Sequence, residues 1–163
     1  MALDGLAAEL DYPMIIVTVT SRSGERAGCL VGFHTQCSID PLRWAVFLST
    51  KNHTYRVALD ADVLAVHFPS AGDHELAELF GSLTGDDLDK FARCDWTEDA
   101  SGAPLLTRCP NRFVGRVLDV LDDGGDHVCF VLEPVTGDHP EPVDQLSFQS
   151  VRDIDPGHEA GRS

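Results

Sequence analysis

The sequence predicts a mainly β protein of the α+β class, a small barrel with a few short peripheral helices. Short β-branched or apolar segments recur with turn residues about every 8–12 positions, and only a few stretches show helical periodicity. The 163 residues fit one domain. A hydrophobic content of 43% and a charged content of 24% are typical of globular chains, so disorder is not expected for most of the protein.

The first two strands are predicted as a hairpin. Residues 14–21 (MIIVTVTS) are rich in β-branched side chains, and residues 27–33 (AGCLVGF) follow a turn around Gly24. Gly28 and Gly32 weaken the second strand, which indicates a bulge or a close approach of another group to the backbone.

The middle of the chain alternates strands and helices. Residues 44–49 (WAVFLS) are too short for a helix and apolar on both faces, so they predict a central strand. Residues 53–61 can form two helical turns, and residues 62–68 (DVLAVHF) predict another strand. A helix with one apolar face is predicted over 74–82, with Asp73 as its cap.

The next part is predicted to end in a long hairpin. A second short helix is expected over 86–92, and residues 93–110 are expected to form an irregular connection. Residues 111–123 and 126–135 then flank Gly124-Gly125, a strong hairpin signal. Beyond residue 137 the composition shifts to Pro, Asp, Glu and His, and the apolar Leu146 and Phe148 predict one last short strand before a loose tail.

Charge and cysteine content exclude several classes of function. With 12 basic against 27 acidic residues, the net charge is −15, so neither nucleic acid nor a membrane surface is expected as a partner. A phosphate site must therefore be built locally. Five cysteines without a CxxC pair argue against a disulfide framework or a zinc ribbon and indicate a reducing cytoplasm. The first residues lack the pattern of a signal peptide.

Common catalytic signatures are missing. The sequence has no GxGxxG after the first strand, no GxxxxGK[ST], no HExxH and no GxSxG. Seven histidines are scattered without ligand spacing, so no metal site is predicted.

Small polar side chains gather at both ends of the strand predicted over 44–49. Those before it are Thr35, Gln36, Cys37 and Ser38, and those after it are Ser49, Thr50, Lys51, Asn52 and Thr54. One interpretation is turn chemistry, with an Asx or Ser turn before the strand and a helix cap by Asn52 after it. The other is a phosphate site, in which main-chain N–H groups converge and hydroxyls, one amide and one ammonium complete the cradle. The residues leave both interpretations open.

Several short motifs follow one another in a set order. They are MIIVTVTS, the run from Gly28 to Gln36, Ser38-Ile39-Asp40-Pro41, WAVFLS, Lys51-Asn52-His53-Thr54, Asp89-Lys90-Phe91, Gly102-Ala103-Pro104-Leu105-Leu106 and Gly125-Asp126-His127. Over residues 12–137 this order resembles the flavin reductase-like, FMN-binding split β-barrels. Gln36 and the Lys51-Asn52-x-Thr54 pattern resemble the flavoredoxin-like branch. The sequence departs from the family at Gly32-Phe33, where paired serines are usual, and at Leu42, where a second proline is usual.

The resemblance implies a split β-barrel of the Greek-key type over residues 1–150, with 151–163 as a loose C-terminal tail. It also implies a set of cofactor-binding residues. The isoalloxazine would lie against Gly32, Phe33, His34, Thr35, Gln36, Cys37 and Ser38, and the phosphate against Ser49, Lys51, Asn52 and Thr54. Lys90 and Phe91 would cover the flavin or simply cap a helix. His127 would lie near the flavin face as the catalytic residue, or would be a hairpin histidine bonded to a neighbouring backbone group.

The implied activity is that of an NAD(P)H-dependent flavin reductase, with FMN or FAD as the flavin, hydride transfer to flavin N5 and release of reduced flavin to an oxygenase or other acceptor. Split barrels of this kind usually form homodimers. Two alternatives stay open. One is a non-catalytic FMN-binding electron-transfer protein, and the other is the same barrel adapted to F420 or heme.

Overall fold

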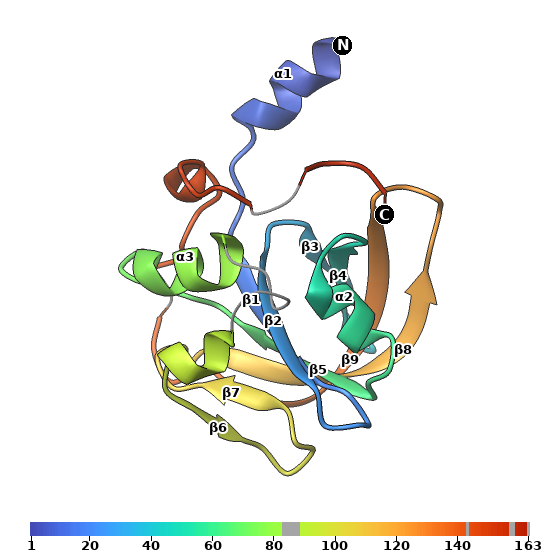
Figure 1. The fold of residues 1–163 in the computed structure, drawn as a ribbon, viewed down its shortest axis with the longest axis vertical. Coiled ribbons are helices and arrows are strands. Elements are labelled where there is room, and N and C mark those ends of the chain that lie inside the picture. Colours follow the sequence, from blue (N-terminus) through green and yellow to red (C-terminus); the bar gives the residue numbers. More distant parts are fainter. Residues whose placement is uncertain (83–88, 143, 157–158, 163) are drawn as a thin grey trace.

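A computed structural model describes residues 1–82, 89–142, 144–156 and 159–162. Its main feature is a seven-stranded antiparallel sheet in the order β2-β1-β5-β8-β9-β4-β3, which curls on itself (Figure 1). The strands are β1 (Ile15–Thr20), β2 (Arg26–Val31), β3 (His34–Ser38), β4 (Arg43–Ser49), β5 (Val63–His67), β8 (Arg112–Leu121) and β9 (His127–Asp138). Because β2 and β4 also touch, although they are near opposite ends of the sheet, the sheet forms a barrel. The predicted mainly β barrel with few short helices is confirmed.

Helices cover the barrel at two places. The short helix α2 (His53–Ala58) packs against β1, β2 and β4, and helix α3 (His74–Ser82) packs against β2. Both were predicted. Asp73 directly precedes α3, and its main-chain carbonyl accepts a hydrogen bond from the Ala77 N–H. Its carboxylate accepts hydrogen bonds from the main-chain N–H and the hydroxyl of Ser70.

Strand β1 is buried on both faces, which explains its continuous apolar sequence. Ile15, Val17 and Val19 point into the barrel interior with residues of β4, β5 and β9. Ile16 points outward, where α3 and the 3-10 helix η1 (Lys90–Arg93) cover it with Phe80. The β1–β2 hairpin turns at Gly24, whose φ of +91° favours glycine.

Another group lies close to the main chain at Gly28, as the sequence predicts, and this group is the Phe80 ring. A Cβ atom on Gly28 would lie 2.7 Å from Cε1 of Phe80, which is only 1% exposed. We expect Gly28→Ala to destabilise the fold by about 2 kcal/mol, because the packed ring has no room to retreat. The melting temperature should then fall by about 4–8 °C. Gly72→Ala is the control, since its nearest atom would be 3.9 Å away. Equal melting temperatures for the two variants would contradict the expectation.

Three segments differ from the prediction. Residues 34–38, interpreted as a possible turn, form the edge strand β3 paired with β4. Residues 93–110, expected to be irregular, contain a second small sheet of β6 (Trp96–Glu98) and β7 (Pro104–Leu106). Its turn is closed by Asp99, whose carboxylate accepts hydrogen bonds from main-chain N–H groups at 101 and 103. A short helix was expected over 86–92. The 3-10 helix η1 occupies the second half of this range, and residues 86–88 lie outside the described residues.

The prediction of a strand around Leu146 and Phe148 is wrong. Only isolated bridges occur there, between Pro13 and Ser147 and between Ser70 and Gln145, before the 3-10 helix η2 (Gln149–Val151). Leu146 is nevertheless buried, because it fills a small apolar cluster with Met14 and Ala77. The alternation of apolar residues at positions 146 and 148 therefore reflects packing against the barrel and not strand pairing.

The helix α1 (Ala2–Glu9) was not predicted. It buries none of its residues and projects from the barrel (Figure 1), where the Gln149 side chain donates to the carbonyls of Ala8 and Leu10. Within the described part of the chain, no helix has the length and apolar character needed to cross a membrane.

Candidate functional site

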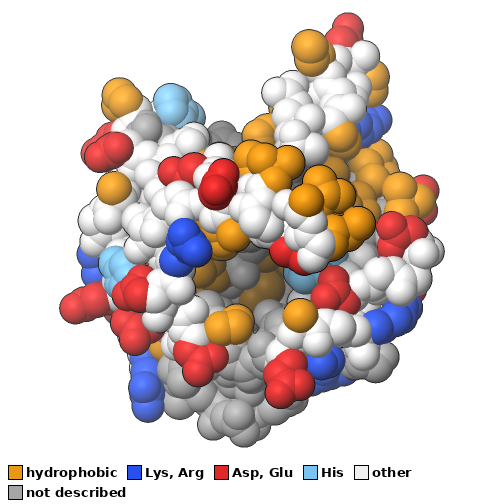
Figure 2. Space-filling model, turned by 90° about the horizontal axis from the view of Figure 1, so that it is seen from above, with side chains coloured by type: hydrophobic (Ala, Val, Ile, Leu, Met, Phe, Trp, Pro, Cys, Tyr) orange, Lys and Arg blue, Asp and Glu red, His pale blue; other side chains and the backbone are white. Residues whose placement is uncertain are grey.

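A pocket of about 330 Å³ opens at one end of the barrel, within the size range of small-molecule sites. Figure 2 shows the hollow from above, with hydrophobic side chains on its walls and acidic groups scattered around it. Segments far apart in sequence contribute to it: the residues before β1, the end of β2 and the two residues after it, the end of β4 and the turn after it, the end of α3, the start of β9, and residues near the C-terminus. The lining residues are Tyr12, Met14, Cys29, Leu30, Val31, Gly32, Phe33, Phe47, Leu48, Ser49, Asn52, Phe80, Gly81, Asp126, His127, Phe148, Pro156 and Ala160.

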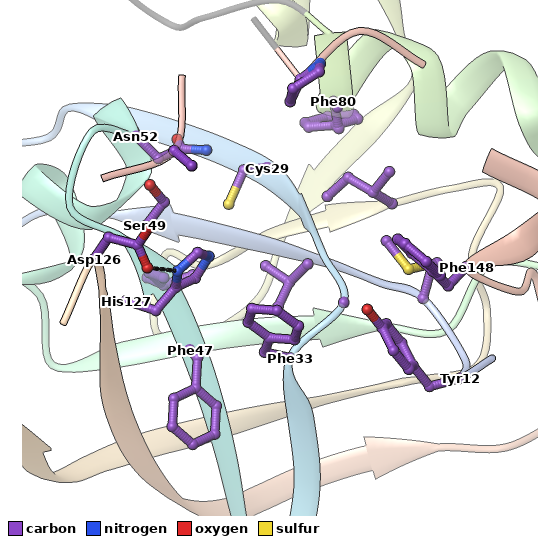
Figure 3. Close-up of a pocket in the computed structure, with 18 residues that line it drawn as sticks. Tyr12, Cys29, Phe33, Phe47, Ser49, Asn52, Phe80, Asp126, His127 and Phe148 are labelled. Atoms are coloured by element: carbon purple, nitrogen blue, oxygen red, sulfur yellow. Dashed lines mark hydrogen bonds and ion pairs between the residues drawn. The ribbon is translucent and has the colours of Figure 1, made fainter. Parts of the chain in front are cut away.

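Aromatic rings form one side of this pocket (Figure 3). Tyr12 stacks on Phe148 with ring centroids 4.8 Å apart, and Phe33 follows Tyr12 at 6.2 Å. A Cβ atom on Gly32 would lie 2.9 Å from the Tyr12 ring, so glycine at this position lets the ring approach the main chain. The result is an apolar wall with the half-exposed Phe33 at its edge.

His127 and Asp126 form the polar counterpart of that wall. Nδ1 of His127 lies 2.8 Å from Oδ1 of Asp126, and the imidazole meets the Phe33 ring edge-on at 5.0 Å (Figure 3). The bond from His127 and a second one from the Gly161 N–H hold the pKa of Asp126 below its usual value, so the carboxylate is ionised and can only accept. Nδ1 therefore carries a proton, and Nε2 is the ring nitrogen left for a ligand.

The turn after β4 uses its main-chain donors internally. The N–H of Thr50 donates to the Asp126 carbonyl, and those of Lys51 and Asn52 donate to Oγ and the carbonyl of Ser49. The N–H of Thr54 donates to Oδ1 of Asn52, which caps α2. The cradle of converging main-chain N–H groups expected here is therefore not formed. The helix cap, which was the other interpretation of Asn52, is confirmed.

Side chains supply the donors at this end of the pocket. Ser49 and Asn52 line it, and since Oδ1 of Asn52 is engaged by Thr54, its amide nitrogen is the group that can donate to a ligand. Nζ of Lys51 lies at the rim, 3.2 Å from the carbonyl oxygen of Ala160, itself a lining residue. One ammonium and one amide thus stand beside the apolar wall.

Several predicted binding residues lie elsewhere. His34 is held between the Pro13 carbonyl at 2.7 Å and the indole N–H of Trp44 at 3.2 Å, and burial lowers its pKa, so it is a neutral structural histidine. The lining does not include the four side chains that follow it on β3. They are Thr35, Gln36, Cys37 and Ser38.

Thr54, Lys90 and Phe91 also lie outside the lining. Thr54 is 1% exposed beneath the turn. Nζ of Lys90 donates to the carbonyls of Gly28 and Phe80, both at 2.9 Å, and Phe91 packs in the cluster under α3. These side chains support the pocket wall from behind.

The residues that the sequence reasoning missed are mainly apolar side chains and Asp126. Their sequence signals are weak, because apolar lining and apolar core look alike in a single sequence. The Gly-Asp-His motif was the one available pointer to Asp126. Across the described ranges, no group of three or more His, Cys, Asp or Glu side chains is arranged to hold a metal ion.

The barrel thus carries a pocket with an aromatic wall, a histidine oriented by a carboxylate, and a lysine ammonium close to one lining residue. Residues 7–153 match the family described as the flavin reductase like domain. This chain therefore belongs to the flavin reductase-like domain family.

Individual relatives agree with this assignment. The chain is 29% identical over 114 residues to an FMN reductase (NADH) RutF of Bradyrhizobium diazoefficiens, covering 70% of this chain and 63% of that protein. It thus spans less than two thirds of that relative. The NADH:FAD oxidoreductase SgcE6 of Streptomyces globisporus superposes with a TM-score of 0.82 at 22% identity, over 92% of this chain and 88% of that one. An FMN-binding protein of Thermus thermophilus has a TM-score of 0.72 at 25% identity, over 78% and 70% of the two chains.

Proposed function

We propose that this protein binds FMN, with FAD as the alternative flavin, and acts as an NAD(P)H-dependent flavin reductase. The observation that carries the proposal is one pocket whose lining brings together Phe33, His127, Ser49 and Asn52, with Nζ of Lys51 3.2 Å from the carbonyl oxygen of the lining residue Ala160. The curated relative named an NADH-dependent FMN reductase and the FMN-binding structural relative support the same ligands.

The residues present fit a flavin mononucleotide. The apolar wall with Phe33 and Tyr12 suits a flat aromatic ring system and excludes water from it. Nζ of Lys51 and the amide of Asn52 would hold the phosphate, and the Ser49 hydroxyl would assist them. The negative net charge makes this local cation necessary, since the rest of the surface repels a phosphate.

Bound flavin supplies a ring that accepts hydride from the nicotinamide. The contribution of this chain is to position the partners and shield them from water. Asp126 holds the His127 ring in one orientation and tautomer. Nε2 then accepts a hydrogen bond in the neutral ring and donates one in the charged ring. We assign it the role of orienting the carboxamide of the nicotinamide beside Phe33.

Steady-state oxidation of NADH and NADPH with added FMN tests the activity. Turnover above the buffer rate with either nucleotide is expected. FMN binding without turnover would instead favour a non-catalytic electron-transfer protein, and a visible spectrum of F420 or heme in the purified protein would favour the third class.

His127→Leu should lower kcat/KM for the nicotinamide by about tenfold, because one hydrogen bond of about 1.4 kcal/mol is lost. The Kd for FMN should change by less than about twofold. His74→Leu is the matched control, since His74 forms a similar pair with Asp153 at 3.2 Å but outside the pocket. An equal loss in both variants would contradict a positioning role for His127.

We further propose a homodimer in the cytoplasm that passes reduced flavin to an oxygenase or another acceptor. The edge strand β3 and an apolar groove lined by Leu42, Trp44 and Val135 support self-association. Five unpaired cysteines fit a reducing compartment. Sedimentation analysis tests the dimer, and a monomer at micromolar concentration would exclude it.

A further inference from the structure

We propose that Ala160, Gly161 and Arg162, here called the clasp, compete with the flavin phosphate for Lys51. In the structure the clasp occupies Lys51, the proposed phosphate anchor, so a flavin phosphate that binds there has to displace it. This inference rests on the proposed function, because it assigns a regulator to the same site.

The first contact of the clasp is with the anchor itself. Nζ of Lys51 donates to the carbonyl oxygen of Ala160 at 3.2 Å, so a neutral main-chain acceptor stands where a phosphate oxygen would bind. Ala160 also lines the pocket, as does Pro156 earlier in the same segment. A ligand that needs the Lys51 ammonium therefore meets the clasp directly.

The second contact joins the clasp to the catalytic side of the pocket. The Gly161 N–H donates to Oδ2 of Asp126 at 2.8 Å, while Oδ1 of the same carboxylate holds His127. One carboxylate thus bridges the clasp and the histidine. Gly161 adopts a φ of +111°, a conformation that side-chain-bearing residues rarely adopt.

The third contact secures the clasp to the β8–β9 turn. The guanidinium of Arg162 donates to the Asp122 carboxylate at 2.7 Å and to the Gly125 carbonyl at 2.8 Å. Asp122 also accepts from the Gly124 N–H, so it is held in place by the turn. The clasp is therefore held at three successive residues, once by Lys51 and twice by residues 122–126.

These contacts suit a reversible competitor. The Arg162–Asp122 pair is about 40% exposed on both sides, and exposed pairs of this kind are weak. If the clasp is closed in about nine molecules of ten, the apparent Kd for FMN is raised by about tenfold over that of the open form. The penalty applies to ligands that use Lys51. Riboflavin, which has no phosphate, should escape it.

Two substitutions open the clasp without changing the pocket residues. Gly161→Ala disfavours the backbone conformation at φ +111°, and Arg162→Gln removes the charge that pairs with Asp122. Each should lower the Kd for FMN by about three- to tenfold in fluorescence titrations of the full chain, and leave the Kd for riboflavin within about twofold. Arg152→Gln is the control, because Arg152 is also exposed near the C-terminus, and its hydrogen bond among the described residues is with the Gln149 side chain.

The possible outcomes separate the two proposals. Tighter FMN binding in both clasp variants, with riboflavin and the control unchanged, supports the clasp. FMN binding that is unchanged or weaker in both clasp variants overturns the clasp and leaves the proposed function intact. A protein that binds FMN in no variant overturns the proposed function and the clasp with it. Melting temperatures equal to that of the unsubstituted protein verify that each variant is folded.

Discussion

Lys51→Met is expected to raise the Kd for FMN by about tenfold and to leave the Kd for riboflavin within about twofold. A charge-assisted hydrogen bond between an ammonium and a phosphate contributes about 1.5–3 kcal/mol. The lower end applies here because Nζ of Lys51 lies at the rim of the pocket, where solvent screens it. Isothermal titration with both flavins measures the effect. Methionine keeps much of the apolar stem, so the difference reports the charge.

The control for this prediction is Arg56→Met on the neighbouring helix α2. It removes one positive charge from the same strongly acidic protein but leaves the pocket lining unchanged. If general electrostatics decided affinity, both substitutions would weaken FMN binding equally. A loss that is the same for FMN and riboflavin would show that Lys51 supports the fold and does not bind phosphate.

The clasp contacts Lys51 through the Ala160 carbonyl, so the Lys51→Met variant also tests the clasp. Without the ammonium, the Ala160 carbonyl loses its hydrogen-bond donor in the turn between β4 and α2. Opening the clasp then no longer exposes a positive charge for the flavin phosphate. Gly161→Ala in the Lys51→Met background should therefore leave the Kd for FMN unchanged within about twofold. Such non-additivity is the signature of two groups that act through one contact.

Local patterns predicted the hairpins and the buried strands well. The β1–β2 and β8–β9 pairs follow from β-branched runs around Gly24 and Gly124, where neighbours in sequence are neighbours in space. Strand β3 was missed because four of its five residues are polar, and pairing with β4 decides its structure. The β6–β7 pair was missed because strands of three residues leave no periodicity.

The site was predictable in part. Of the residues named from the family resemblance, Gly32, Phe33, Ser49, Asn52 and His127 line the pocket. That they bind a flavin stays a prediction. The main-chain donors near Ser49 could not be assigned from sequence, because whether a turn consumes its own N–H groups depends on its exact path. The contact of Lys51 with Ala160 joins residues 109 positions apart, and no local pattern encodes such a contact. A single sequence likewise does not show whether a lysine such as Lys90 points into the pocket or into the protein interior behind it.

Lys90 illustrates that last point, because its buried ammonium serves the fold. It is 4% exposed, and Nζ donates to the Phe80 carbonyl in the last turn of α3 and to the Gly28 carbonyl of β2. A carbonyl in the last turn of a helix has no partner within the helix, and a cation there also complements the helix dipole. Lys90 thereby ties α3 to the strand beneath it and holds Phe80 and Gly81 at the pocket wall.

Lys90→Met should therefore cost about 2 kcal/mol of unfolding free energy and lower the melting temperature by about 4–8 °C. Two carbonyls lose a hydrogen-bond donor. The variant also avoids the desolvation cost of a buried ammonium, but this gain offsets only part of the loss. Arg93→Met in the same 3-10 helix is the control, since Arg93 is exposed and should change stability by less than about 0.5 kcal/mol. Equal stability of the Lys90 variant and the unsubstituted protein would contradict the expectation.

The pH dependence of this difference provides an independent measurement. Burial lowers the pKa of Lys90 below its ordinary 10.5, so between the folded value and 10.5 the unfolded chain binds more protons than the folded one. The stability that Lys90 contributes therefore rises as pH increases through this window. The neutral amine still donates to both carbonyls while the cost of burying a charge disappears. Urea unfolding at pH 7 and pH 9.5 should show a larger gap between the unsubstituted protein and Lys90→Met at the higher pH. A gap that narrows with rising pH would mean that the ammonium is not buried in the folded protein.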